Sequence, residues 1–248
     1  MSRPRRQPRY VPGYYASWFC FIGVGLLLNL GCMPMLLLPR RERYGPAVRS
    51  VIRALFDLWV RWFHFTGVLH ITWPGCDVPL TPGTVYIANH PTLLDATFLL
   101  ARLPDAICIF KPALMRNPAI GPAAIMAGYS AGDPGVDLVR EVAGKIAAGR
   151  SLLVFPEGTR TQPGTPLNPL RPGFALMAAR AGAPVQLFVL RSSKGLVPRG
   201  RPWWRPPDVL PATLEIALDR RWEHDPARSP EELTAEVERH LRIRLAGG

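Results

Sequence analysis

Residues 84–100 read TVYIANHPTLLDATFLL. The first five, residues 84–88, form a short β-rich run of the kind found in buried strands. A proline at position 91 suits the first turn of a helix, and the sequence that follows it predicts a helix over residues 91–103. This stretch therefore predicts a strand that leads into a helix, with Asn89 and His90 between the two.

The same order of strand and helix continues along the chain. Strands are expected at residues 69–73, 84–88, 106–110, 151–155, 185–190 and 213–218. Helices are expected at residues 91–103, 117–126, 136–148, 171–181 and 230–245. Several of these strands are continuous apolar runs, which is typical of strands covered by helices on both faces. We therefore predict an α/β fold with a mostly parallel central sheet and helices on both faces.

The N-terminal segment has a different pattern. Residues 11–39 carry no formal charge and exceed the roughly 20 residues that a bilayer core requires. Arginines flank this run at positions 3, 5, 6 and 9 and again at 40, 41 and 43. We predict a membrane helix, or a re-entrant hairpin if Asn29, Gly31 and Pro34 break it.

Residues 48–68 form a second N-terminal segment, with apolar and basic residues on opposite helical faces. Such an amphipathic helix packs on the soluble core or lies in the membrane interface. We therefore divide the chain into membrane-associated helices at residues 1–66 and an α/β domain at residues 67–248.

The net charge of the chain indicates which classes of partner it can bind. Thirty Lys and Arg residues against 18 Asp and Glu residues give a formal charge of +12. Phospholipid, phosphorylated small molecules and nucleic acid all suit that charge. The sequence has no recognised nucleic-acid motif, and its apolar N-terminus disfavours that partner. The cysteines at 20, 32, 76 and 108 form no C-x-x-C pair, so we expect free thiols and no metal site.

Polar residues gather where the predicted strands end. Asn89 and His90 follow residues 84–88, Lys111 follows residues 106–110, and the sequence PEGTRT at 156–161 follows residues 151–155. In an open α/β sheet the ligand crevice lies beyond the carboxyl ends of the strands. A base, an ammonium group and a guanidinium group are therefore expected at one edge of the sheet.

The spacing of His90 and Asp95 restricts how they can meet. Within one regular helix, five residues turn two side chains about 140° apart. The two side chains can therefore bond only if His90 precedes the helix and Asp95 lies about one turn inside it. A carboxylate that holds one imidazole nitrogen leaves the other as a base. Because no Ser or Cys stands in an obvious nucleophile position, we predict that His90 activates a substrate hydroxyl directly.

The loop at residues 156–161 suits an anion. Gly158 permits an unusual backbone angle, and the Thr159 hydroxyl and the Arg160 guanidinium can bind a phosphate. Two ordinary structural alternatives stay open for this edge of the sheet. One is a capped helix with an exposed histidine, and the other is a solvated turn with an ion pair between Glu157 and Arg160.

These residues resemble the signature motifs of the glycerolipid acyltransferases, the PlsC-type family that includes the 1-acyl-sn-glycerol-3-phosphate acyltransferases. The family motif N-H-x-x-x-x-D matches Asn89, His90 and Asp95, and the motif F-P-E-G-T-R matches residues 155–160 letter for letter. A further motif is matched in part by Lys111, Leu114, Pro118, Gly121 and Gly128. Its distal arginine is missing, because residues 129–133 read YSAGD. The resemblance covers roughly residues 67–195.

The resemblance implies a reaction and a set of roles. His90 would be the general base and Asp95 would orient it, while Lys111, Glu157, Gly158, Thr159 and Arg160 would bind substrate. The donor would be acyl-CoA or acyl carrier protein, the acceptor a lysophosphatidic acid-like lysolipid, and no metal or cofactor would be needed. The enzyme would lie on the cytoplasmic face of the cell inner membrane.

Two alternatives remain beside this interpretation. In the first, the same fold acylates another acceptor, such as a lyso-aminolipid or an aryl-polyene lipid, because the motif that lacks its arginine departs from the family pattern. The second alternative is not an enzyme but a catalytically silent, membrane-bound protein that binds anions or lipids. The intact pair of His90 and Asp95 disfavours the silent binder, since binding alone does not require a base.

Overall fold

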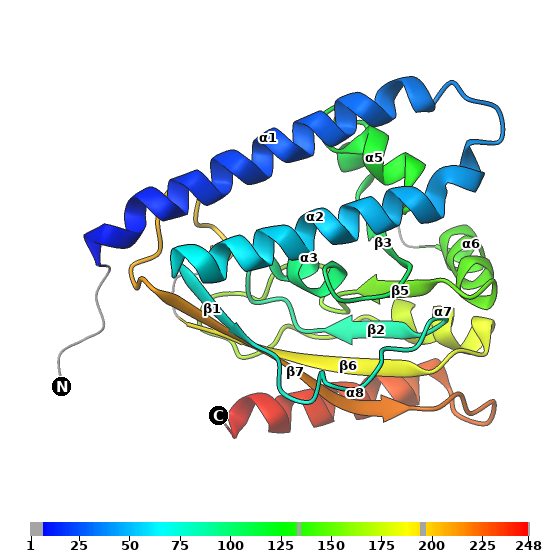
Figure 1. Ribbon diagram of the computed structural model, residues 1–248. Helices are drawn as coiled ribbons and strands as arrows, with labels where there is room; N and C mark the ends of the chain where they lie inside the picture. Colours follow the sequence, from blue (N-terminus) through cyan, green and yellow to red (C-terminus); the bar gives the residue numbers. More distant parts are fainter. Residues whose placement is uncertain (1–6, 133–134, 194–196, 248) are drawn as a thin grey trace.

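The computed structural model describes residues 7–132, 135–193 and 197–247 (Figure 1). At its centre lies a seven-stranded sheet in the order β1-β7-β6-β2-β5-β3-β4. The strands are β1 Leu69–Thr72, β2 Val85–Ala88, β3 Ala106–Phe110, β4 Ser130–Ala131, β5 Ser151–Val154, β6 Val185–Ser192 and β7 Ala212–Trp222. The strands from β6 to β4 in this order run parallel, and only the β6–β7 pair is antiparallel among the described strands. The predicted α/β fold with a mostly parallel sheet is confirmed.

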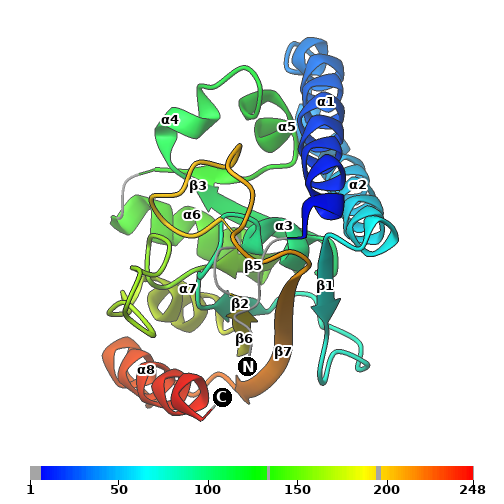
Figure 2. The same ribbon diagram turned by 90° about the vertical axis from the view of Figure 1, so that its left-hand side faces the viewer.

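Helices cover both faces of the sheet. They are α1 Val11–Met35, α2 Gly45–Thr66, α3 Asp95–Leu100, α4 Pro112–Met115, α5 Gly121–Met126, α6 Val136–Ala147, α7 Gly173–Ala181 and α8 Pro230–Ala246. Figure 2 shows α2 and α3 on one face and α6, α7 and α8 on the other, with α1 outside α2. The core lies between these layers, and all four residues of β2 are buried in it.

Two predicted helices differ from the structure. The helix after His90 begins at Asp95 and not at residue 91, because residues 91–94 form a turn in which Thr92 bonds to the Asp95 carboxylate. The helix predicted at residues 117–126 is shortened to α5, which begins at Gly121 after the turn that follows α4. At the start of α5 the backbone comes so close that a Cβ on Gly121 would lie 2.1 Å from the carbonyl oxygen of Met115.

The N-terminal helix α1 is unbroken over 25 residues. The alternative prediction of a re-entrant hairpin broken near Asn29 and Gly31 is therefore wrong. The helix is long and apolar enough to cross a membrane, by length and composition alone. Its inner face docks on the domain. Trp59 of α2 donates its indole N–H to the carbonyl oxygen of Ser17 at 3.0 Å, and the Asn29 side chain accepts from the backbone N–H of Ala123 at 3.0 Å.

The outer face of α1 carries exposed apolar side chains at spacings of three and four residues. We call this set the outer stripe; its members are Tyr15, Phe19, Ile22, Leu26, Leu30 and Met33. The predicted amphipathic helix is α2, which buries Ile52, Trp59 and Phe63 against the domain. The flanking arginines at positions 3, 5 and 6 lie outside the described residues.

A buried arginine joins α2 to two distant segments. The Arg49 Nε donates to Asp105 at 2.6 Å, just before β3, and its Nη1 donates to the carbonyl oxygen of Ala127 at 2.7 Å, just after α5. The Arg49 side chain is only 3% exposed. A buried guanidinium requires such partners, so this contact fixes α2 on the sheet.

Replacing Arg49 should therefore destabilise the fold. We expect Arg49→Met to lower the free energy of unfolding by roughly 1–3 kcal/mol, because Asp105 and the Ala127 carbonyl lose their donor. Arg61→Met on the same helix should change it by only about 0–1 kcal/mol, since Arg61 pairs with Asp57 in solvent. Denaturant unfolding of the detergent-solubilised protein measures both. Equal losses in the two variants would contradict the role of Arg49.

Candidate active site

The candidate site lies at the carboxyl ends of two neighbouring strands. Ile87 of β2 pairs with Val154 of β5, so the residues that follow these strands emerge side by side. His90 lies two residues beyond β2, and the loop at residues 155–160 follows β5. In Figure 2 these strand ends face the viewer.

The side chains of His90 and Asp95 are in contact. The Nδ1 of His90 lies 2.9 Å from Oδ2 of Asp95, whose side chain is fully buried. The same carboxylate accepts from the backbone N–H and the hydroxyl of Thr92. Because an ionised carboxylate only accepts, we assign the imidazole proton to Nδ1. The other nitrogen, Nε2, then keeps its lone pair and bonds to no residue that the structure describes.

The ring of His90 is also held from the side. It stacks on the ring of Phe155 with centroids 4.0 Å apart and planes 17° apart. Its side chain remains 18% exposed, so a ligand can reach it. The preceding residue, Asn89, is buried and exchanges two 2.8 Å hydrogen bonds with the backbone of Leu190 in β6. Asn89 therefore extends the pairing of β2 with β6 up to the site.

Glu157, to which the resemblance gives a role in substrate binding, contacts only protein groups in the structure. It is buried, and its Oε1 accepts from the backbone N–H of His90 at 2.8 Å and from the Thr161 hydroxyl at 2.9 Å. Its Oε2 accepts from the backbone N–H of Asn168 at 2.9 Å. No ion pair joins it to Arg160, although the structure describes both residues. This carboxylate holds the backbone of the site and is not presented to a ligand.

Arg160 supplies the positive charge of the loop at residues 155–160. Its Nη1 donates to the carbonyl oxygens of Val197 at 3.3 Å and Pro198 at 3.1 Å. Burial lowers the pKa of this guanidinium, repulsion from Arg199 lowers it further, and the carboxylate of Asp95 acts in the opposite direction. A bound anion would offset the repulsion between the two guanidinium groups.

A second cation that the sequence did not reveal lies beside Gly158. Gly158 has φ of 68°, and a Cβ built there would lie 3.2 Å from Nε of Arg171. The Arg171 and Thr159 side chains are exposed and bond to none of the described residues. Lys111 is exposed after β3, on the far side of β5 from His90, and its ammonium group likewise has no partner within the described ranges. The structure therefore brings Gly158, Thr159, Arg160 and Arg171 together and leaves Lys111 one strand away.

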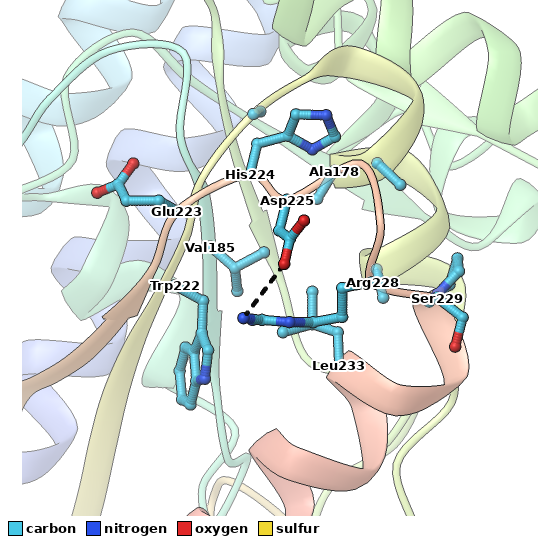
Figure 3. Close-up of a pocket in the computed structure, with 13 residues that line it drawn as sticks. Ala178, Val185, Trp222, Glu223, His224, Asp225, Arg228, Ser229 and Leu233 are labelled. Atoms are coloured by element: carbon cyan, nitrogen blue, oxygen red, sulfur yellow. Dashed lines mark ion pairs between the residues drawn. The ribbon is translucent and has the colours of Figure 1, made fainter.

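Cysteine does not supply a nucleophile near His90. All four cysteines are free, and burial raises the pKa of the Cys108 thiol in β3 to about 12. Within the described residues no group of three or more His, Cys, Asp or Glu side chains is placed to hold a metal ion. The pocket drawn in Figure 3 lies at the other end of the sheet, where β6 begins at Val185 and β7 ends at Trp222. None of the predicted site residues lines it.

Sequence reasoning missed three contributors to the site. Thr92 lies three residues before Asp95, which is the spacing of a capping box and would have been a usable signal. Asn168 and Arg171 have no comparable local pattern, because they return to the site from the far end of the loop after β5.

Comparison with known proteins agrees with this geometry. A family model described as Acyltransferase matches residues 75–190. The chain is 33% identical over 132 residues to a chloroplastic 1-acyl-sn-glycerol-3-phosphate acyltransferase of Brassica napus, covering 51% of this chain and 37% of that protein. It is 32% identical over 119 residues to the 1-acyl-sn-glycerol-3-phosphate acyltransferase of Helicobacter pylori, covering 46% of this chain and 50% of that protein. The matched region thus spans half or less of these curated relatives.

The crystal structure of the 1-acyl-sn-glycerophosphate acyltransferase PlsC from Thermotoga maritima has the same fold. It superposes with a TM-score of 0.72 at 20% identity, over 96% of this chain and 94% of that one. The matched segment at residues 75–190 contains His90, Asp95 and the loop after β5. Together with the curated relatives, this match supports the PlsC-type acyltransferase family for residues 75–190.

Proposed function

We propose that this protein is a membrane-bound O-acyltransferase that moves an acyl chain from acyl-CoA or acyl carrier protein to a hydroxyl of a lysophosphatidic acid-like acceptor. The observation that carries this proposal is the fixed orientation of His90. Its Nδ1 is bound to the buried Asp95 at 2.9 Å, which leaves Nε2 as the one imidazole nitrogen able to accept a proton.

The reaction needs no covalent acyl-enzyme. Nε2 of His90 accepts the proton of the acceptor hydroxyl while the hydroxyl oxygen attacks the thioester carbonyl carbon. The new ester C–O bond forms, the C–S bond breaks, and the proton on His90 passes to the departing thiolate. Asp95 holds the imidazole in the required tautomer and stabilises its charged form during the transfer.

The acceptor phosphate is assigned to the exposed groups of the loop after β5. Arg160 belongs to this loop, the Arg171 side chain lies beside Gly158, and the Thr159 hydroxyl bonds to none of the described residues. Guanidinium groups suit phosphate because they form paired, charge-assisted hydrogen bonds. Glu157 positions the loop, because all three of its donors come from the protein and hold its carboxylate inside the fold.

Membrane attachment is assigned to the outer stripe of α1. An exposed row of large apolar side chains along a helix flanked by arginines fits the boundary between headgroups and acyl chains. Attachment there gives the site access to lipid acceptors. We place the enzyme on the cytoplasmic face of the cell inner membrane, where thioester donors are made.

An acceptor with another headgroup is the second candidate. Residues 129–133 carry no basic side chain where the family motif has its arginine, and residue 133 lies outside the described part of the chain. Tyr129 is buried with its ring 5.4 Å from that of Phe110, so it does not replace a cation. A panel of lysolipid acceptors tests the two candidates directly.

Loss of the base should abolish most turnover. We expect His90→Ala to lower kcat by about 10²–10⁴-fold and Asp95→Asn to lower it as well, because an amide can stabilise the wrong imidazole tautomer. His70→Ala, at an exposed position on β1, is the matched control and should keep wild-type turnover. Release of the thiol from the donor is the measurement. A folded His90→Ala protein with near-wild-type kcat would refute the mechanism.

The phosphate assignment predicts a selective change in KM. Arg160→Lys and Arg171→Gln should each raise the KM of the acceptor more than that of the thioester donor, because a planar guanidinium binds phosphate in a way that an ammonium or an amide cannot. The effect should vanish for an acceptor that lacks the phosphate. Equal rises in both KM values would count against these two arginines as phosphate ligands.

Attachment through the outer stripe should resist salt. Full-length protein should stay with the membrane fraction at high ionic strength, because salt screens charge but not apolar contact. The double variant Phe19→Glu/Leu30→Glu should move to the soluble fraction. Ile243→Glu, at an exposed apolar position on α8, should not. If salt alone releases the wild-type protein, attachment by the outer stripe is wrong.

A further inference from the structure

A loop between β6 and β7 connects the candidate site with α1. We call residues 197–205 the Trp loop, because it carries Trp203 and Trp204 together with Arg199 and Arg205. In Figure 2 it crosses in front of the carboxyl ends of the strands. Neither the sheet nor the proposed chemistry accounts for two adjacent tryptophans at such a position.

One end of the Trp loop is fixed to the site. The carbonyl oxygen of Val197 accepts from the backbone N–H of Leu93 at 3.2 Å and from Arg160 at 3.3 Å. Pro198 gives a second carbonyl oxygen to Arg160 at 3.1 Å. Val197 itself is buried. The start of the loop is therefore held by the turn after His90 and by the proposed phosphate-binding arginine.

The other end of the Trp loop is fixed to α1. The Tyr14 hydroxyl donates to the carbonyl oxygen of Trp203, and the Tyr15 hydroxyl donates to that of Trp204 at 3.1 Å. The ring of Trp203 packs on Trp18 with centroids 5.1 Å apart. Since Tyr15 is the first member of the outer stripe, the loop continues the apolar surface of α1.

The tip of the loop presents an aromatic and basic surface. Trp204 is 59% exposed and Trp203 is 37% exposed. Arg199 and Arg205 are exposed, and neither guanidinium has an acidic partner within the described residues. Tryptophan favours the membrane interface because its ring is apolar and its N–H is polar, and exposed arginine adds attraction to anionic headgroups.

We propose that the Trp loop is a second membrane contact, which binds the headgroup region of anionic phospholipids beside the outer stripe of α1. The proposal rests on the membrane attachment given above as part of the proposed function. A bilayer surface suits both parts of this region, because the outer stripe and the basic tip of the Trp loop that carries the tryptophans adjoin at Tyr15. Since the same loop binds Arg160, it also sets the phosphate site next to the lipid surface.

The test compares two matched double variants of the full-length protein. Trp204→Ser/Arg205→Gln changes the tip without touching Arg160, Val197 or Pro198. Ile243→Ser/Arg239→Gln likewise removes one exposed apolar side chain and one arginine, here on α8, on the other side of the sheet. Flotation with vesicles of phosphatidylcholine alone, and of phosphatidylcholine with phosphatidylglycerol, gives the partition coefficient of each protein.

We expect the loop variant to lose roughly tenfold in partitioning onto the phosphatidylglycerol vesicles and less onto phosphatidylcholine alone. The α8 variant should match the wild type on both. If the loop variant also matches the wild type, or loses equally on both vesicles, the assignment to anionic headgroups is overturned. If the wild type binds neither vesicle, membrane attachment by α1 is refuted together with the Trp loop. Wild-type binding with an unaffected loop variant refutes the Trp loop alone, so the two results are distinguishable.

Discussion

The carboxylate of Glu157 is the contact on which the geometry of the site depends. A buried carboxylate without partners would cost several kcal/mol, and here three protein donors meet it. One donor is the backbone N–H of His90, and Thr161 returns a hydrogen bond to the His90 carbonyl oxygen at 2.8 Å. The backbone of the proposed base is thus tied to the loop after β5 on both sides. The junction of β2 and β5 therefore sets the position of the His90 backbone independently of the contacts that its side chain makes.

A second buried carboxylate completes this arrangement. Asp95 fixes the imidazole ring as Glu157 fixes the backbone, so the proposed base would need little reorganisation to accept a proton. Protein donors occupy both carboxylates, so neither one is turned toward a ligand. The Thr159 hydroxyl and the Arg171 guanidinium have no partner among the described residues at this edge, and the Arg160 guanidinium bonds only to the carbonyl oxygens of Val197 and Pro198. A site with two buried carboxylates therefore has cationic side chains at its surface, which suit the proposed phosphate-bearing acceptor.

The parts of this structure that sequence could predict are those governed by local patterns. The strands were predictable because a strand buried on both faces leaves a continuous apolar run, as in β2. The contact of His90 with Asp95 was predictable from a histidine that precedes the helix, but Asp95 is the first residue of α3 and not one turn inside it, so the two side chains meet across the turn at residues 91–94. The antiparallel pairing of β7 was not predictable, since its partner β6 is chosen by long-range packing. The partners of Glu157 and the approach of Arg171 to Gly158 depend on how the loop at residues 157–171 folds back, which no local spacing encodes.

The docking of α1 also decides how the proposed membrane attachment can work. Ser17 and Asn29 lie about 18 Å apart along the helix and bond to α2 and α5 respectively. A helix held at both places would carry α2 into the hydrocarbon if it crossed the bilayer. The exposed Arg53 and Arg61 of α2 would then each cost about 2.5–3.5 kcal/mol near the bilayer centre. A helix lying in the interfacial plane avoids that cost, because its outer stripe meets the acyl chains while the arginines stay among the headgroups.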